Sequence, residues 1–227
     1  MLLKKWICLC FMCLLLLTAC GSQVIIEWVD LIKWDGEQYE AVYEVALADR
    51  SFIDKDIGEV DFKVADHIKR TSYRFKDGDA AFHEKGTKLY AIKGLDDAIA
   101  VEDQSVINGY RIYMIRAEAP PRRNFDQVPL EEVKKIEFYA STEEGNRKTA
   151  SYTNQSDMAA IKAILVNSKP APSFEPNGDT NRYDVLLYTD DAIAFQYGIQ
   201  FDGTTYFWFP SENAILSNDI QQFISKD

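Results

Sequence analysis

The residues of this chain best suited to covalent chemistry are its cysteines, and all four lie within the first 20 positions. A cysteine thiolate is the form that attacks electrophiles and binds metals. Cys20 differs from the other three because two small residues, Thr18 and Ala19, precede it and let the backbone lie extended in a narrow peptidase cleft. These residues at this spacing place a thiol directly after an accessible stretch of backbone.

The segment before Cys20 has the layout of an export signal. Lys4 and Lys5 provide a positive start, and residues 6–17 form an unbroken apolar run. A secretory signal has this order of parts and ends in small residues. Because the run is shorter than the roughly 20 residues that cross a bilayer, we expect residues 1–19 to be removed as a signal peptide.

The motif Leu17-Thr18-Ala19-Cys20 resembles the lipobox of bacterial lipoproteins. The resemblance implies cleavage before Cys20, an S-diacylglyceryl group on its thiol and N-acylation of its new amino terminus. Several acyl chains on one residue hold a protein stably on a membrane, whereas a single chain binds only marginally. The expected location is therefore the cell membrane, on its extracytoplasmic face. The alternative is an ordinary signal peptide with a chance cysteine.

A second resemblance lies further along the chain. The segment Gly78-Asp79-Ala80-Ala81-Phe82, followed by residues 85–94, is similar to a block in uncharacterised lipoproteins of Bacillus-type Gram-positive bacteria. This resemblance implies a cell-envelope setting. It carries no activity, cofactor or site residue with it.

The remaining sequence contains no motif for catalysis, for a metal or for a cofactor. His83-Glu84 begins like a zinc-protease helix, but the second histidine is missing. Residues 54–65 alternate carboxylates as calcium loops do, but Ala65 stands where the twelfth-position glutamate belongs. A pair of carboxylates for glycoside hydrolysis can come from distant positions in the sequence. With 36 acidic residues in the chain, the sequence does not indicate which two would form such a pair.

The charge of the mature chain excludes one class of partner. The first 19 residues hold two of the 25 basic residues and no acidic one, so 23 basic and 36 acidic residues remain, a net charge of −13. Such a chain lacks the basic footprint of a nucleic-acid-binding protein. By the same net charge, we do not expect its surface to be drawn to anionic lipid headgroups. An envelope protein or a wall polymer remains as the expected partner, beside the membrane that the lipid anchor enters.

The chain divides into two expected units. Residues 20–118 are predicted to form a small all-β barrel or sandwich, because Asp35-Gly36, Asp77-Gly78 and Asn108-Gly109 supply the positive φ angles of hairpin turns. Paired prolines then mark a linker over residues 119–130. Residues 131–227 form the second expected unit.

The second unit has a mixed pattern. Strands are expected at 133–139 and 148–152, then a helix at 156–165 capped by Ser156, a three-stranded meander over 183–210 and a short closing helix at 217–224. We therefore predict an antiparallel α+β unit and an α+β class overall. Residues 206–209 place aromatic rings on both faces of one strand, and an exposed face there would suit a sugar or a peptide. The alternative is that both faces are buried.

These observations favour a non-enzymatic binding or adaptor module anchored in the cell envelope. The alternative is a carboxylate-dependent enzyme that acts on cell-wall polymers. A solute-binding subunit of a transporter would need two sizeable α/β lobes, which the β-rich first unit does not supply.

Overall fold

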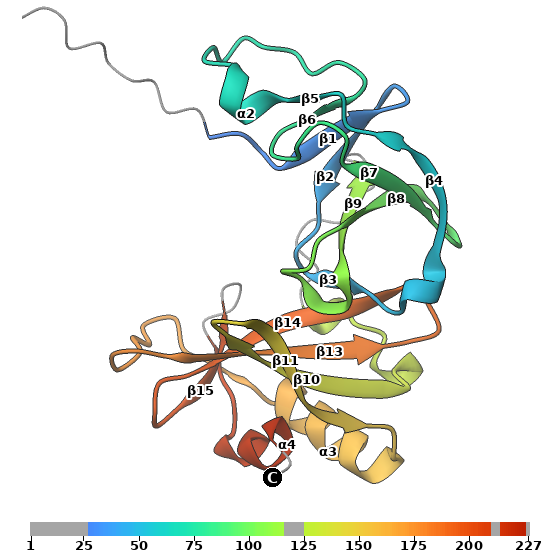
Figure 1. The fold of residues 1–227 in the computed structure, drawn as a ribbon. Coiled ribbons are helices and arrows are strands. Elements are labelled where there is room, and N and C mark those ends of the chain that lie inside the picture. Colours follow the sequence, from blue (N-terminus) through green and yellow to red (C-terminus); the bar gives the residue numbers. More distant parts are fainter. Residues whose placement is uncertain (1–26, 116–124, 210–213, 226–227) are drawn as a thin grey trace, which may run out of the picture.

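The computed structural model describes residues 27–115, 125–209 and 214–225, and its main feature is a pair of large β-sheets (Figure 1). Strands make up 45% of the structure and helical segments 19%. The expected α+β class, and the α+β assignment of the C-terminal unit in particular, is therefore wrong, and the protein is mostly β. Cys20 and Ala19, the predicted lipidation and cleavage residues, lie outside the described residues.

The first sheet has the order β4-β7-β8-β9-β2-β1-β6-β5, and only β5 and β6 pair in parallel. Figure 1 shows it strongly curved. Its strands are β1 (Leu31–Trp34), β2 (Glu37–Ala41), β4 (Ile53–Glu59), β5 (Phe62–Lys63), β6 (Asp79–Ala80), β7 (Lys88–Ile92), β8 (Leu95–Glu102) and β9 (Tyr110–Ile115).

Two of the three predicted hairpin turns are confirmed. Asp35 and Gly36 have φ values of 49° and 80° and join β1 to β2. Asn108 and Gly109 have φ values of 63° and 77° in the loop between β8 and β9. Gly78 also has a positive φ, but its turn leads into β6, which pairs with β1 and β5. The local turn there was foreseeable from Asp-Gly, whereas the pairing of the next strand was not.

The second sheet has the order β11-β10-β13-β14-β15-β16-β12, and β3 also pairs with β14. Its strands are β3 (Val45–Leu47), β10 (Lys135–Thr142), β11 (Gly145–Tyr152), β12 (Lys169–Pro170), β13 (Asn181–Tyr188), β14 (Ile193–Phe201), β15 (Tyr206–Phe209) and β16 (Ala214–Ile215).

Helices cover one face of the second sheet (Figure 1). The α-helices are α2 (Val64–His67), α3 (Gln155–Val166) and α4 (Gln221–Ile224), and the 3-10 turns are η1 (Arg50–Phe52), η2 (Ile107–Gly109), η3 (Phe125–Gln127), η4 (Leu130–Glu132) and η5 (Asn218–Ile220). Within the described ranges, none of these helices has the length and apolarity needed to cross a membrane. The helices expected at 156–165 and 217–224 correspond to α3 and to η5 with α4, but these short segments beside a large sheet leave the structure mostly β.

The residues of α3 follow the helical period that the sequence predicts. Asn154, two positions before the expected cap, accepts a hydrogen bond from the Asp157 backbone N–H at 2.8 Å and begins the helix. Met158, Ile161 and Leu165 are buried in a core that also contains side chains from β10, β13, β14, β15 and α4. The position of α3 on the sheet follows from burial of this apolar face.

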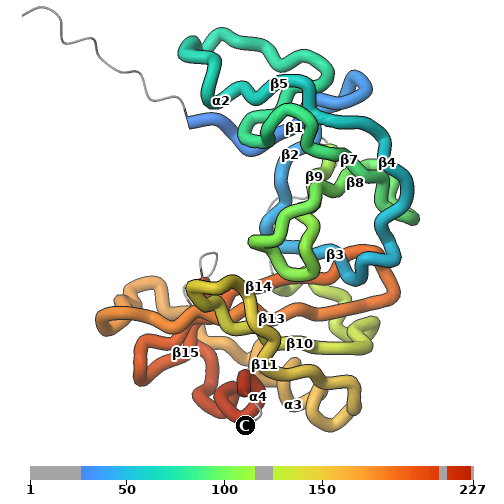
Figure 2. Tube along the Cα trace, viewed as in Figure 1, coloured from blue at the N-terminus to red at the C-terminus, as the bar shows by residue number. Residues whose placement is uncertain are grey.

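One short strand joins the two sheets. Val42 donates its backbone N–H to Ile112 of the first sheet, and two residues later Glu44 accepts from the Gln196 N–H of the second. β3 then pairs with β14, so the chain passes from one sheet into the other (Figure 2). Leu47 of β3 and Ile193 of β14 share a core with residues of β7, β8 and β9.

Candidate functional site

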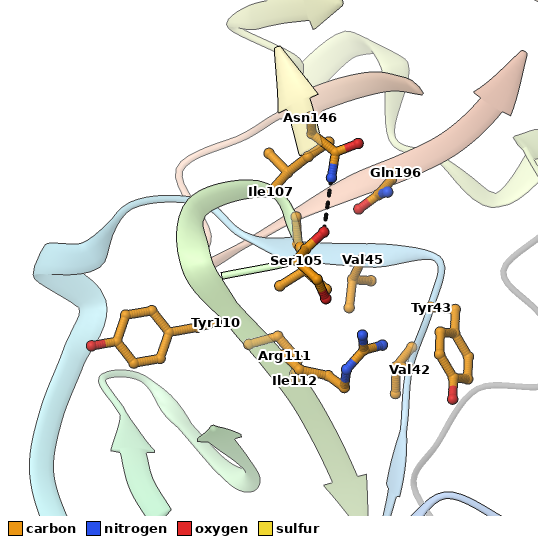
Figure 3. A pocket seen from close by; sticks show the side chains of 12 residues that line it. Val42, Tyr43, Val45, Ser105, Ile107, Tyr110, Arg111, Ile112, Asn146 and Gln196 are labelled. Carbon is orange, nitrogen blue, oxygen red and sulfur yellow. Dashed lines mark hydrogen bonds between the residues drawn. The ribbon is translucent and has the colours of Figure 1, made fainter. Parts of the chain in front are cut away.

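A groove lies where the two sheets meet. It consists of two hollows of about 260 Å³ and 490 Å³. Both hollows are lined by Tyr43, Ser105, Asn146 and Gln196. Figure 3 shows the smaller one, with Arg111 extending from β9 toward Tyr43 and Asn146 reaching Ser105 from the second sheet. Because the two hollows share these four residues, they adjoin, and both sheets contribute to their lining.

The first sheet supplies a fixed cation to the groove. The Arg111 guanidinium pairs with Asp103 at 2.9 Å and lies 5.4 Å from the centre of the Tyr43 ring. Asp103 also accepts from the backbone and the hydroxyl of Ser105, and these donors together hold the pKa of its carboxyl below its usual range. An arginine held by both a carboxylate and an aromatic face is preorganised for hydrogen bonding with its remaining donors.

The second sheet supplies a half-buried carboxyl group. Asp184 of β13 accepts a hydrogen bond from the Gln196 side-chain amide at 3.1 Å. Burial raises the pKa of Asp184, and this effect exceeds the lowering by Gln196 and by the charge of Arg182. A raised pKa in a cleft is typical of functional carboxyl groups.

The groove wall beyond Asp184 is formed by Arg182 and Phe209. The Arg182 guanidinium lies 4.9 Å from the centre of the Phe209 ring. Gly198 is required beside it, because a Cβ at that position would lie 2.3 Å from the Phe209 carbonyl oxygen. Among the described residues, Arg182 forms no ion pair closer than 4.0 Å, so its guanidinium donors are available to a ligand.

Within the second sheet, a buried carboxylate links the three neighbouring strands β11, β10 and β13. Glu137 of β10 is 3% exposed and accepts hydrogen bonds from Tyr188 at 2.7 Å, Lys148 at 2.8 Å and Tyr139 at 2.9 Å. These donors lower the pKa of Glu137 to about 2, against the desolvation that opposes them. Every acceptor direction is used, so this cluster is structural and not a free reactive group.

The two histidines lie in different surroundings. His83 is half-buried in a loop, and its Nε2 lies 2.6 Å from the hydroxyl of the buried Tyr113. Tyr113 donates in turn to Asp30, at 3.1 Å. His67 is exposed at the end of α2, and its ring lies 5.2 Å from that of Phe62. Burial lowers the pKa of His83, which keeps the imidazole neutral at pH 7.

The residues of the possible calcium loop lie on a strand. Asp54 and Asp56 belong to β4, and Asp56 pairs with Lys88 at 3.3 Å. Throughout the ranges the structure describes, no group of three or more His, Cys, Asp or Glu side chains is arranged to hold a metal ion. A larger hollow of about 810 Å³ beside Trp34 has five aspartates in its lining, but Asp77 there already accepts from the Gly36 N–H.

The aromatic strand has both faces covered. Tyr206 and Trp208 are buried in the core under α3 and α4. On the other face Phe207 packs against Phe174 at 5.0 Å between ring centres, and Phe209 lies beneath Arg182. The exposed aromatic patch considered from the sequence is therefore not formed by this strand.

Sequence patterns did not single out the residues of the groove. Gln196 interrupts an otherwise apolar run in β14, and Asp184 directly precedes the apolar half of β13. Ser105 and Asn146 lie among polar residues, and Arg111 is a single cation in the otherwise apolar run of β9, so no motif marks any of these residues. Their proximity depends on the passage of residues 42–47 between the sheets.

Comparison with known proteins gave no relative. No protein-family model matches the chain, and searches of curated proteins and of solved structures found no similar protein.

Proposed function

We propose that this chain is a lipoprotein held on the extracytoplasmic face of the cell membrane by Cys20, and that its inter-sheet groove binds a carbohydrate segment of a wall polymer without transforming it. The lining of the groove supports the binding role. It combines two carboxyl groups, two side-chain amides and two arginines over a length formed by two adjoining hollows. An elongated, open site of this kind accommodates a polymer segment better than a compact metabolite.

The hydrogen-bonding capacity of the lining favours carbohydrate. Gln196 uses one amide N–H on Asp184, and within the described residues its amide oxygen has no partner. One oxygen of Asp184 is likewise unoccupied there. Amides and carboxyl groups can serve hydroxyls that both donate and accept, which sugars carry at each ring. The exposed Tyr43 adds an aromatic edge.

A peptide that adds a strand to a sheet edge fits this groove less well. The backbone groups of residues 42–44 already pair with Ile112 and Gln196. Main-chain hydrogen bonds are the basis of strand addition, and here those bonds are made within the chain.

The binding proposal is tested by titrating purified, muramidase-released wall glycan fragments into the protein and measuring heat. Replacing Gln196 with alanine should weaken binding about tenfold, as expected for loss of one or two hydrogen bonds. Gln200→Ala is the matched control, because Gln200 lies on the same strand and bonds to Thr180 outside the groove. Equal affinity in wild type and Gln196→Ala would contradict the proposal.

Hydrolysis of the same polymer is a second candidate, and the raised pKa of Asp184 favours it. A carboxyl group whose pKa is raised by burial is suited to act as a general acid, and Glu44 lines the same groove. Incubation of the glycan fragments with the protein, followed by mass spectrometry, separates the two functions. Products that form with wild type and are lost in Asp184→Asn would establish the enzyme, whereas intact fragments support binding alone.

The lipid anchor is tested by the intact mass of protein extracted from membranes. The expected species begins at Cys20 and carries a diacylglyceryl group, and it should be absent from a Cys20→Ser chain because serine has no thiol to modify. A soluble wild-type species cut at another bond would contradict the anchor.

A further inference from the structure

The end of the molecule nearest the predicted anchor carries a basic loop. We define it as residues 68–76, Ile-Lys-Arg-Thr-Ser-Tyr-Arg-Phe-Lys, between α2 and β6. Its four cations, Lys69, Arg70, Arg74 and Lys76, are all exposed. None of these four side chains takes part in an ion pair with any described residue. In a chain with a formal net charge of −11, this is a local surplus of positive charge.

The basic loop is held in place by its aromatic residues. Tyr73 donates to the buried carboxylate of Asp79 at 2.7 Å, and Asp79 also accepts from the Lys76 backbone N–H at 2.8 Å. The Phe75 ring lies 5.9 Å from that of Tyr73 and 5.7 Å from that of Trp28. The cations are thus presented from an ordered support instead of a free tail.

The nearby acidic groups have partners of their own. Asp66 pairs with Lys63 at 2.9 Å. Asp77 accepts from the Gly36 N–H at 3.0 Å, and Asp79 is buried. None of these three carboxylates forms an ion pair with any of the four cations.

The loop also lies close to the predicted anchor along the chain. Trp28 is eight residues after Cys20. Eight extended residues span at most about 29 Å, so the Trp28–Phe75 contact cannot lie farther than that from the lipid-bearing residue. Figure 1 shows α2 and the adjoining loop at the end of the molecule opposite α3 and α4.

We propose that the basic loop docks on the anionic headgroups of the membrane that holds Cys20, with Trp28 and Phe75 at the interface, and so orients the groove away from the bilayer. Each Lys or Arg near an anionic surface contributes about a fivefold preference for the bound state. Aromatic residues are enriched at membrane interfaces, where an apolar ring and a polar environment meet. The proposal rests on the lipid anchor of the proposed function.

The test uses the mature lipidated protein in phosphatidylcholine vesicles with and without phosphatidylglycerol. Thr71→Cys carries a fluorophore at the exposed loop, and headgroup spin-labelled lipid acts as quencher. No other free thiol competes, because the mature chain has only Cys20 and its thiol is acylated. We expect strong quenching only with phosphatidylglycerol, and little quenching of the same label on Ser168→Cys near the far end of α3.

A charge variant and a matched control separate the effect of the loop's own charge on docking from the effect of the protein's net charge. Replacing Lys69, Arg70, Arg74 and Lys76 with glutamine should lower the docked-to-undocked ratio about fivefold for each cation removed. The control replaces four other cations with glutamine and should leave quenching unchanged. These cations are exposed elsewhere on the molecule and form no ion pair with a described residue: Lys55, Lys85, Arg147 and Lys169. High salt should release the wild-type loop because it screens the attraction.

The test distinguishes failure of the docking proposal from failure of the lipid anchor. Protein that stays on the vesicles with an unquenched loop label, or with equal quenching in both lipid mixtures, would overturn the docking of the basic loop but not the anchor. Protein that does not stay on vesicles, with a Cys20 thiol that reacts with the fluorophore, would overturn the anchor, and the docking proposal that rests on it would fall as well.

Discussion

At the scale of single residues, the same dipeptide plays two different structural roles. Asp35-Gly36 forms its turn through positive φ values at both residues. In Asp202-Gly203 the aspartate side chain instead accepts from the backbone N–H groups of Asn177, Thr204 and Thr205 at 2.8 to 3.1 Å. These donors lower the pKa of Asp202 to about 2. The Asp-Gly pair therefore marks a turn in both segments, but a different local contact forms the turn in each.

Glu137 gives a prediction about stability and pH. Replacing it with glutamine removes the charge that Lys148 and Lys135 neutralise and should lower the free energy of unfolding at pH 7 by about 3 kcal/mol. Because folding lowers the pKa of Glu137 from 4.5 to about 2, its contribution is fully present above pH 4.5 and is lost as the pH falls toward 2.

Urea denaturation at several pH values measures this difference. The gap between wild type and Glu137→Gln should narrow steadily below pH 4.5. Glu131→Gln, at an exposed position, should stay within about 0.5 kcal/mol of wild type throughout. A gap for Glu137→Gln that is constant with pH would show that packing, and not charge, is responsible for it.

At the scale of elements, local pattern determined what could be foreseen. The bounds of β7 and β9 coincide with apolar, β-branched and aromatic runs, and α3 follows its apolar spacing because one face must be buried. The helix is capped by Asn154 instead of Ser156, because an asparagine oxygen two positions earlier meets the Asp157 N–H. The exact position of a helix cap depends on a few local atoms, and the spacing of residue types indicates it only to within one or two residues.

Pairing between distant segments was not foreseeable in this way. β3 has only three residues, all apolar, and a run of that length fits a strand of either unit. Its pairing with β14 is decided by burial of Val45 and Leu47 against both sheets. The groove forms around residues 42–44, which lead into β3. Because no local pattern specifies how β3 pairs, the candidate site could not be predicted from the sequence. The basic loop, in contrast, is visible in the sequence, but the net charge of the whole chain conceals it.

At the scale of the whole molecule, the passage of β3 between the sheets bears on whether the two expected units unfold separately. The sheets share a hydrophobic core that includes Leu47, Ala98, Ile112 and Ile193. Asn108 of the first unit also donates to the Leu47 carbonyl oxygen at 2.7 Å and approaches Tyr188 of the second sheet at 3.4 Å. Apolar and polar contacts therefore connect the same elements, which favours unfolding as one cooperative unit.

Leu47→Ala tests this coupling. Leu47 is fully buried, so its truncation should cost about 2–5 kcal/mol through lost burial and a residual cavity. If the sheets unfold together, native-state hydrogen exchange should show the slowest amides of β8 and of β13 accelerated by the same factor, and calorimetry should show a single transition at lower temperature. Val166→Ala, at an exposed apolar position on α3, should leave both unchanged. Two calorimetric transitions, or faster hydrogen exchange in one sheet alone, would mean that residues 20–118 and 131–227 are independent domains. The groove between them could then widen by movement of one domain against the other.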